Sequence, residues 1–96
     1  MNRQRGKRNE KAVEKLLQGR CVGILGKEDV MTKDFSVECK SKEKLPRWLE
    51  KCWEQAVNNK EGDKVALLQI HKTGNRHTED FIVLRLEDFL NLLHKS

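Results

Sequence analysis

The chain has 96 residues, of which 36% are hydrophobic and 36% are charged, and its formal net charge is +5. This length predicts one domain spanning residues 1–96. No apolar run approaches the ~18 residues that would span a bilayer, which excludes a membrane-spanning protein. The basic start has no apolar segment after it, so we expect no secretory signal. Three scattered cysteines do not suit a disulfide scaffold and predict a reducing, cytoplasmic location.

The excess positive charge lies at the start of the chain. Residues 1–20 carry seven basic and two acidic side chains, whereas the later residues carry equal numbers of each. Four of the seven are clustered: Arg3, Arg5, Lys7 and Arg8. Such a cluster displaces counterions from nucleic-acid phosphates, so we predict a basic arm over about residues 1–8 that binds DNA. The alternative is a solvated terminus that only aids solubility.

Hydrophobic periodicity predicts the elements of the first half of the chain. Over residues 9–18 the apolar side chains form one helical stripe, with Asn9 placed as N-cap and Gly19 as the stop. The stripe consists of Ala12, Val13, Leu16 and Leu17. A short strand is expected over residues 20–25, followed by a turn. An alternating strand is expected over residues 35–40.

In the second half, Pro46 opens the next predicted helix, because proline suits a first helical turn. Its apolar stripe is expected to be buried and consists of Trp48, Leu49, Cys52, Trp53, Ala56 and Val57. Strands are expected over residues 65–70 and 81–86, with a polar loop between them, and a short helix over residues 87–93. The predicted order is α-β-β-β-α-β-β-α, an α/β fold in which helices flank one mixed central β-sheet.

Charged side chains at two places suggest a metal site. Period-2 alternation puts Glu38 and Lys40 on the same face of one strand. Asp29 precedes them across a predicted hairpin, so strand pairing can bring the two carboxylates together. Oxygen ligands with retained waters are what Mg²⁺ prefers, and a neighbouring lysine can stabilise charge on phosphate oxygens. The alternative is a structural ion pair with no catalytic role.

These residues resemble the core of the PD-(D/E)XK nuclease superfamily, and more narrowly its archaeal Holliday junction resolvase-like branch, which includes small phage members. The similarity covers residues 5–70. It rests on Gly6-Lys7-Arg8-Asn9-Glu10 at the first helix, on Asp29 in Gly26-Lys27-Glu28-Asp29-Val30, and on Glu38-Cys39-Lys40. Glu28 stands where the nominal motif has proline, and the segment between Asp29 and Glu38 is shorter than in the larger resolvases.

The resemblance implies a restriction-endonuclease-like core and assigns roles to single residues. Asp29, Glu38 and the backbone carbonyl of Cys39 would bind the metal, and Lys40 would position the attacking water. Glu10 would be a further catalytic residue at the start of the first helix. Gln55, on the second helix, would reach the site and support the metal ligands without binding the metal itself. Lys42 and Lys44 would join the basic arm in contacting DNA phosphates.

The resemblance also implies the activity. We expect a magnesium-dependent DNA endonuclease, with manganese able to substitute, that resolves Holliday junctions or other branched DNA. A resolvase cuts at two opposed points, so a homodimer is expected. The expected location is the cytoplasm of a bacterial or archaeal host, and the gene would belong to the host or to a phage. The alternative is a non-catalytic DNA-binding or assembly module on the same fold.

The other polar and aromatic residues have simpler interpretations. Glu14 is expected to be solvated, and Trp48 and Trp53 to lie in the core. The cysteines Cys21, Cys39 and Cys52 are expected to pack as small apolar groups. His71 and His77 lie in a polar loop and His94 near the end of the chain. The first two could ligate a metal, and the alternative is that they are ordinary loop residues.

Overall fold

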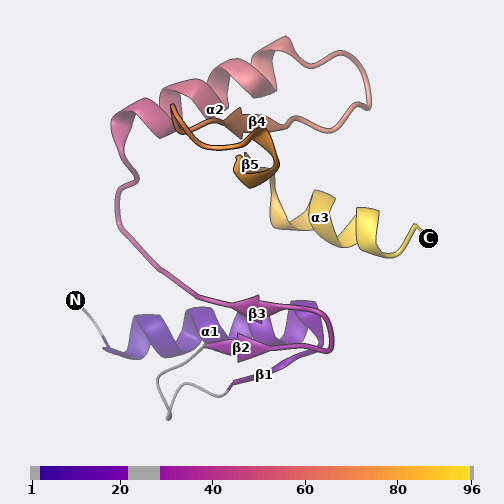
Figure 1. The fold of residues 1–96 in the computed structure, drawn as a ribbon. Helices are drawn as coiled ribbons and strands as arrows, with labels where there is room; N and C mark the ends of the chain where they lie inside the picture. The colour runs from indigo at the N-terminus through magenta and orange to yellow at the C-terminus, as the bar shows by residue number, and fades with distance from the viewer. Residues whose placement is uncertain (1–2, 22–28, 96) are drawn as a thin grey trace. The chain divides into compact units, whose positions relative to one another are not determined.

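The structure is a computed structural model that describes residues 3–21 and 29–95. The chain divides into two compact units, residues 1–43 and 44–96, which are described separately. Within the described ranges the protein is mixed α/β, as predicted, with three α-helices and two small antiparallel sheets (Figure 1). One mixed central sheet was expected, whereas the described strands form a three-stranded and a two-stranded sheet. No helix in the described ranges has the length and apolar character needed to cross a membrane.

Helix α1 spans Arg3–Leu17 and therefore begins well before the predicted start at Asn9. Asn9 lies inside the helix, so its assignment as N-cap is wrong. The early start is explained by the high helix propensity of arginine, lysine and glutamine, which the apolar periodicity does not detect. The segment predicted as a basic arm thus forms the first turns of α1 from Arg3 onward.

Helix α1 ends in a left-handed turn at Gln18, whose φ is 56°. The N–H of Gly19 donates to the carbonyl of Glu14 at 2.9 Å, and the N–H of Gln18 donates to that of Lys15 at 3.3 Å. These two bonds are the Schellman pattern of a helix C-terminus. The left-handed residue is Gln18, not the predicted Gly19. Gly19 is needed for space, because a Cβ there would lie 2.6 Å from the carbonyl oxygen of Met31.

The first unit packs α1 against a sheet of three short strands, β1 (Arg20–Cys21), β2 (Val30–Met31) and β3 (Ser36–Val37). The order is β1-β2-β3 and both pairs are antiparallel, with Val30 opposite Cys21 on one side and Val37 on the other. Val30 is fully buried beneath the helix. The strand predicted over residues 35–40 is shorter here. Of the strand predicted over residues 20–25, only Arg20–Cys21 lies within the described ranges, and residues 22–28, with the turn predicted there, lie outside them.

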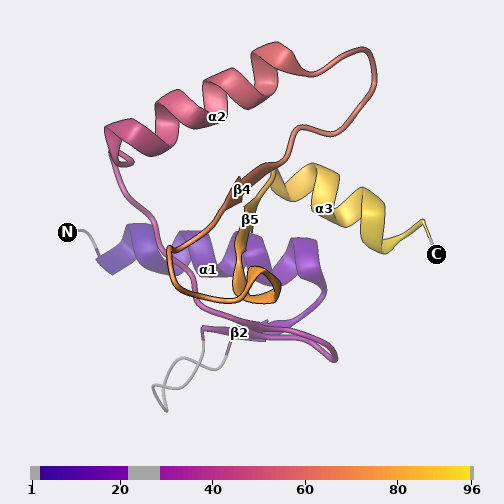
Figure 2. The same cartoon turned by 45° about the horizontal axis from the view of Figure 1, so that its top comes forward.

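The second unit joins helix α2 (Arg47–Asn59) to the hairpin β4 (Leu68–Ile70) and β5 (Phe81–Val83), followed by helix α3 (Leu86–Leu93). Pro46 directly precedes α2, as predicted. The hairpin is antiparallel, with Ile70 opposite Phe81, and α2 contacts β4. Both views show β4 beside β5 with the orange connection between them (Figures 1 and 2). That connection contains a 3₁₀ turn, η2 (His77–Glu79).

Each unit has a thin core. Among the described residues, only Val30 and Ala66 are buried apolar side chains. The predicted burial of the α2 stripe is wrong for Trp48, which is 56% exposed, and Cys21, Cys39 and Cys52 are half-buried rather than enclosed. The described strands are two or three residues long, so they offer little apolar surface for the helices to cover.

Candidate functional site

Asp29 lies at a bend immediately before β2, where the strand pairing becomes irregular. Its N–H donates to the carbonyl of Val37 at 2.9 Å, although Val37 pairs with Val30. Two consecutive residues therefore face one residue of the partner strand, which is the pattern of a β-bulge. The Asp29 side chain reaches the continuation of the partner strand, where its Oδ2 accepts the backbone N–H of Cys39 at 2.7 Å. Its other carboxylate oxygen has no partner among the described residues.

Glu38 and Lys40 lie on either side of Cys39 in the chain, so the Asp29 carboxylate is held at the centre of the Glu-x-Lys segment. The Lys40 ammonium is 3.2 Å from a Glu38 carboxylate oxygen. Both side chains are open to solvent, with 62% of Glu38 and 72% of Lys40 exposed. An exposed pair of this kind contributes little to stability. The pair also matches the predicted placement of the two side chains on one face.

The pKa of the Cys39 thiol is affected by the charges around this segment. Burial raises its pKa above the usual thiol value, and the negative charges of Asp29 and Glu10 raise it further. Cys21 and Glu38 add smaller effects of the same sign. Glu10, on α1, therefore lies close enough to Cys39 to act on it electrostatically. The contacts of this segment are thus Asp29 with the Cys39 backbone and Lys40 with Glu38. Glu10, Asp29, Glu38 and Cys39, all within the described ranges, do not include a group of three whose ligand atoms come as close together as a shared metal ion requires.

Glu14 was predicted to be solvated, and the structure corrects this. Its Oε2 accepts the backbone N–H of Cys21 at 3.0 Å, and its Oε1 is 3.7 Å from the Lys11 ammonium. The hydrogen bond from Cys21 holds the pKa of this carboxyl below its ordinary value, and the charge of Lys11 lowers it further. Glu14 therefore links α1 to β1, a contact that helical periodicity alone does not indicate.

The remaining predicted residues belong to several elements of the two units. Lys7 and Arg8 are exposed on α1, whereas Arg3 and Arg5 are described only by their backbone. Lys42 and Lys44 are exposed after the Glu-x-Lys segment. Gln55 is exposed on α2, in the second unit, whereas the acidic residues above lie in the first. The phosphate contacts and the orienting role of Gln55 stay predictions.

The second unit contains a cavity of about 590 Å³ beside α2. Trp53 and Leu49 line it from the helix, and Val83 and Arg85 line it from the end of β5 and the start of α3. The Arg85 guanidinium lies 5.9 Å from the centre of the Trp53 ring, within the range of a cation–π contact. None of the residues predicted for the metal site lines this cavity.

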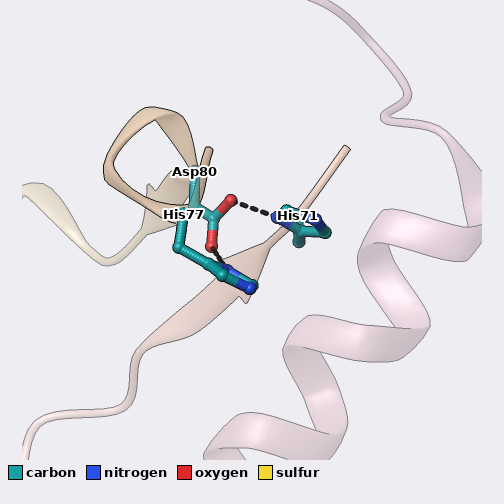
Figure 3. A group of neighbouring side chains, drawn as sticks. All are labelled: His71, His77 and Asp80. Carbon is teal, nitrogen blue, oxygen red and sulfur yellow. Dashed lines mark hydrogen bonds and ion pairs between the residues drawn. The ribbon is translucent and has the colours of Figure 1, made fainter. Parts of the chain in front are cut away.

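A second group of polar side chains gathers at the β4–β5 connection and includes Asp80, which no sequence pattern above singled out. Nδ1 of His71 donates to one oxygen of the Asp80 carboxylate at 2.6 Å, and Nδ1 of His77 donates to the other at 3.0 Å. Gln69 donates to the same carboxylate at 2.6 Å. Figure 3 shows both imidazoles directed at the Asp80 carboxylate. The signal available in the sequence was the spacing of three between His77 and Asp80.

The two groups differ in their metal-binding chemistry. Within the described ranges, one group of three histidine, cysteine, aspartate or glutamate side chains has ligand atoms that all lie within 4.8 Å of one another. It consists of His71, His77 and Asp80. Asp29 and Glu38 offer carboxylate oxygens, which suit Mg²⁺ with several waters retained. His94, at the C-terminus of α3, belongs to neither group.

Comparison of the chain with protein-family models, with curated proteins and with solved structures gave no match.

Proposed function

We propose that this protein is a magnesium-dependent DNA endonuclease with a PD-(D/E)XK active site and a restriction-endonuclease-like core. The observation that supports the proposal best is the hydrogen bond from the Cys39 N–H to Asp29. It holds the carboxylate of a β-bulge residue at the backbone of Cys39, which lies in the chain between Glu38 and Lys40, the two charged residues of the motif. Bulges frequently re-aim a side chain beside an active site.

The donor set fits a hard cation. One Asp29 oxygen is occupied by the Cys39 N–H, which leaves the other oxygen, together with the exposed Glu38 carboxylate, for a metal. Mg²⁺ favours such oxygen donors and, when bound, would neutralise charge on the scissile phosphate. The charge of Glu10 acts on the nearby Cys39 thiol, and we propose that Glu10 adds a negative charge to the site.

In the proposed reaction a water molecule attacks the phosphorus in line with the bond to the 3′ oxygen. A P–O bond to the water oxygen forms as the P–O3′ bond breaks, which leaves a 5′ phosphate. The water proton passes to solvent, and the departing 3′ oxygen takes up a proton. The Lys40 ammonium lies beside Glu38, where it would orient the water and stabilise the negative charge that develops on the phosphate oxygens.

The substrate is proposed to be branched DNA. The exposed Lys7 and Arg8 on α1, with Arg3 and Arg5 in the same helix, would contact phosphates without reading sequence. Resolution of a four-way junction requires two opposed cuts, which a two-fold homodimer supplies.

The ion pair between Lys40 and Glu38 supports a second candidate function. Because Lys40 neutralises Glu38, one carboxylate fewer is free to bind a metal ion. This is what a DNA-binding module without catalysis would have. A strict absence of cleavage in Mg²⁺ and in Mn²⁺, with DNA binding intact, would support this second function and contradict the first.

The test is a nicking assay on supercoiled DNA and on labelled junction, flap and duplex substrates. Cleavage is expected with Mg²⁺ or Mn²⁺ and not with EDTA. Asp29→Asn can still accept the Cys39 N–H, so it should fold and bind DNA while losing cleavage, and Glu38→Gln should behave alike. Glu61→Gln, which removes an exposed acid 4.0 Å from Lys64 in the second unit, is the matched control and should cut normally.

A further inference from the structure

We propose that His71, His77 and Asp80 bind a divalent transition metal ion of the zinc class at the β4–β5 connection. All three ligands belong to the second unit, whereas the acidic residues proposed to bind magnesium belong to the first. The proposal therefore does not depend on nuclease activity.

The backbone of the hairpin brings two of the ligands together. The register pairs Ile70 with Phe81, so one further step along the hairpin places His71 opposite Asp80. Residues that face each other in this way share one face of the sheet. Gln69 lies two residues before His71 and shares that face, which explains its hydrogen bond to Asp80.

The 3₁₀ turn supplies the third ligand. The N–H of Asp80 donates to the carbonyl of His77 at 3.0 Å, which closes the turn between them. The His77 ring then stacks on the His71 ring, with their centres 4.1 Å apart. Both imidazoles thus present Nδ1 to the same carboxylate (Figure 3).

The charge of Asp80 supports a cation at this position. Its side chain is only 8% exposed, and burial of a carboxylate is costly unless it is compensated. The three described partners of this carboxylate are Gln69, His71 and His77, and none of them is a lysine or an arginine. A divalent ion in place of the two shared protons would supply the missing positive charge.

The ligand atoms must rearrange locally to surround one ion. Tetrahedral ligands at ~2.1 Å from zinc lie ~3.4 Å from one another. His71 Nδ1 lies 2.6 Å from one Asp80 oxygen and His77 Nδ1 lies 3.0 Å from the other. The three ligand atoms lie within 4.8 Å of one another, so they must move to reach the ~3.4 Å separations around one ion. His77 is 79% exposed and free to move outward. Imidazole nitrogens favour zinc and its neighbours over Mg²⁺, and water would complete the coordination.

Metal binding should be measured by zinc titration calorimetry and by thermal unfolding with and without zinc. The wild type is expected to bind one zinc ion. The affinity for zinc should be at least ~10-fold weaker in His77→Asn. At a zinc concentration 100 times Kd, the folding equilibrium should shift by about 100-fold. His94→Asn removes a histidine outside the group and should leave both measurements unchanged.

The tautomers give a second readout. Before zinc is added the Nδ1 atoms carry the protons, because an ionised carboxylate only accepts. Zinc on Nδ1 would move the proton of each ring to Nε2, which changes the imidazole ¹⁵N shifts of His71 and His77. His77 is exposed, so His77→Asn should fold even where Asp80→Asn does not. Equal zinc affinity in wild type and His77→Asn would overturn the proposal.

Cobalt distinguishes this site from the cysteines. A Co²⁺ complex with nitrogen and oxygen ligands is expected to lack the thiolate charge-transfer bands that binding by Cys21, Cys39 or Cys52 would produce. Strong thiolate bands at one equivalent of Co²⁺ would show that the ion binds elsewhere and would contradict the assignment. Nicking by His77→Asn in Mg²⁺ should equal that of the wild type.

Discussion

The Lys40 ammonium lies 3.2 Å from the Glu38 carboxylate, and both side chains extend into solvent. A pair exposed to this extent typically contributes about 1 kcal/mol or less to folding. The ion pair of Lys40 therefore has little structural value, although Lys40 follows Cys39 in the chain, and the backbone N–H of Cys39 holds the Asp29 carboxylate. The catalytic and the structural interpretations of Lys40 consequently predict different results.

We predict that Lys40→Met lowers DNA cleavage by roughly 10²-fold or more, because a positioned charge that stabilises the transition state is lost. The melting temperature should change little, and magnesium binding should persist because a nearby positive charge is removed. Lys64→Met breaks another exposed ion pair and serves as the control, which should cleave DNA normally. A folded Lys40→Met protein with full nicking activity would contradict the proposed active site.

A second prediction concerns the positive charge of α1. Replacing its first four basic residues by glutamine keeps helix propensity nearly constant while removing the proposed phosphate contacts. The slope of log K against log salt for DNA binding should shrink by up to ~0.9 per lost contact. The charge-matched control replaces the exposed lysines Lys60, Lys64, Lys72 and Lys95. Equal slopes for the two variants would show that net charge alone governs binding.

The third prediction uses two glycines of the first unit. A Cβ at Gly19 would meet the carbonyl oxygen of Met31 at 2.6 Å and side-chain atoms of Val30 and Thr32 at 2.9 Å, whereas a Cβ at Gly6 meets nothing within 4 Å. Gly19→Ala should therefore destabilise the protein by about 1–3 kcal/mol. Gly6→Ala, inside α1, should stabilise it by about 0.5–1 kcal/mol. Urea unfolding of both variants measures the difference, and equal effects would be inconsistent with the packing of α1 on β2.

A fourth prediction concerns pH. The pKa of Glu14 is lowered in the folded state by the Cys21 N–H and by Lys11, so its ionised form stabilises the protein above the unfolded value of ~4.3. That contribution should be lost as the pH falls through the lower folded pKa. Urea midpoints of wild type and Glu14→Gln should differ most near neutral pH and converge in acid. A constant difference across this range would show that the carboxylate charge is not involved.

The sequence predicted the positions of the helices better than their ends. Periodicity located α1, α2 and α3 because each carries an apolar stripe. It missed the start of α1 at Arg3, since charged residues with high helix propensity form no stripe. The predicted alternation of more buried and more exposed side chains over residues 35–40 is observed. Only Ser36 and Val37 are paired as a strand, because the pairing of β2 becomes irregular at Asp29.

The acidic site was partly visible in the sequence, since the motif spacing marks Asp29, Glu38 and Lys40. That Asp29 bonds to the backbone of Cys39 depends on the bulge, which no side-chain pattern encodes. Asp80 was missed for a similar reason. Its contact with His71 arises from hairpin register, and register depends on the turn rather than on the hydrophobic alternation of either strand.

Both tryptophans of the chain, Trp48 and Trp53, lie in α2, and the sequence has no tyrosine. Intrinsic fluorescence therefore monitors residues 44–96 and is silent for the unit that contains Asp29 and Glu38. Far-ultraviolet circular dichroism follows the helices of both units. Unfolding curves recorded by the two methods should coincide if the units unfold together. A dichroism change that precedes the tryptophan signal would instead reveal that the unit with the acidic residues melts on its own.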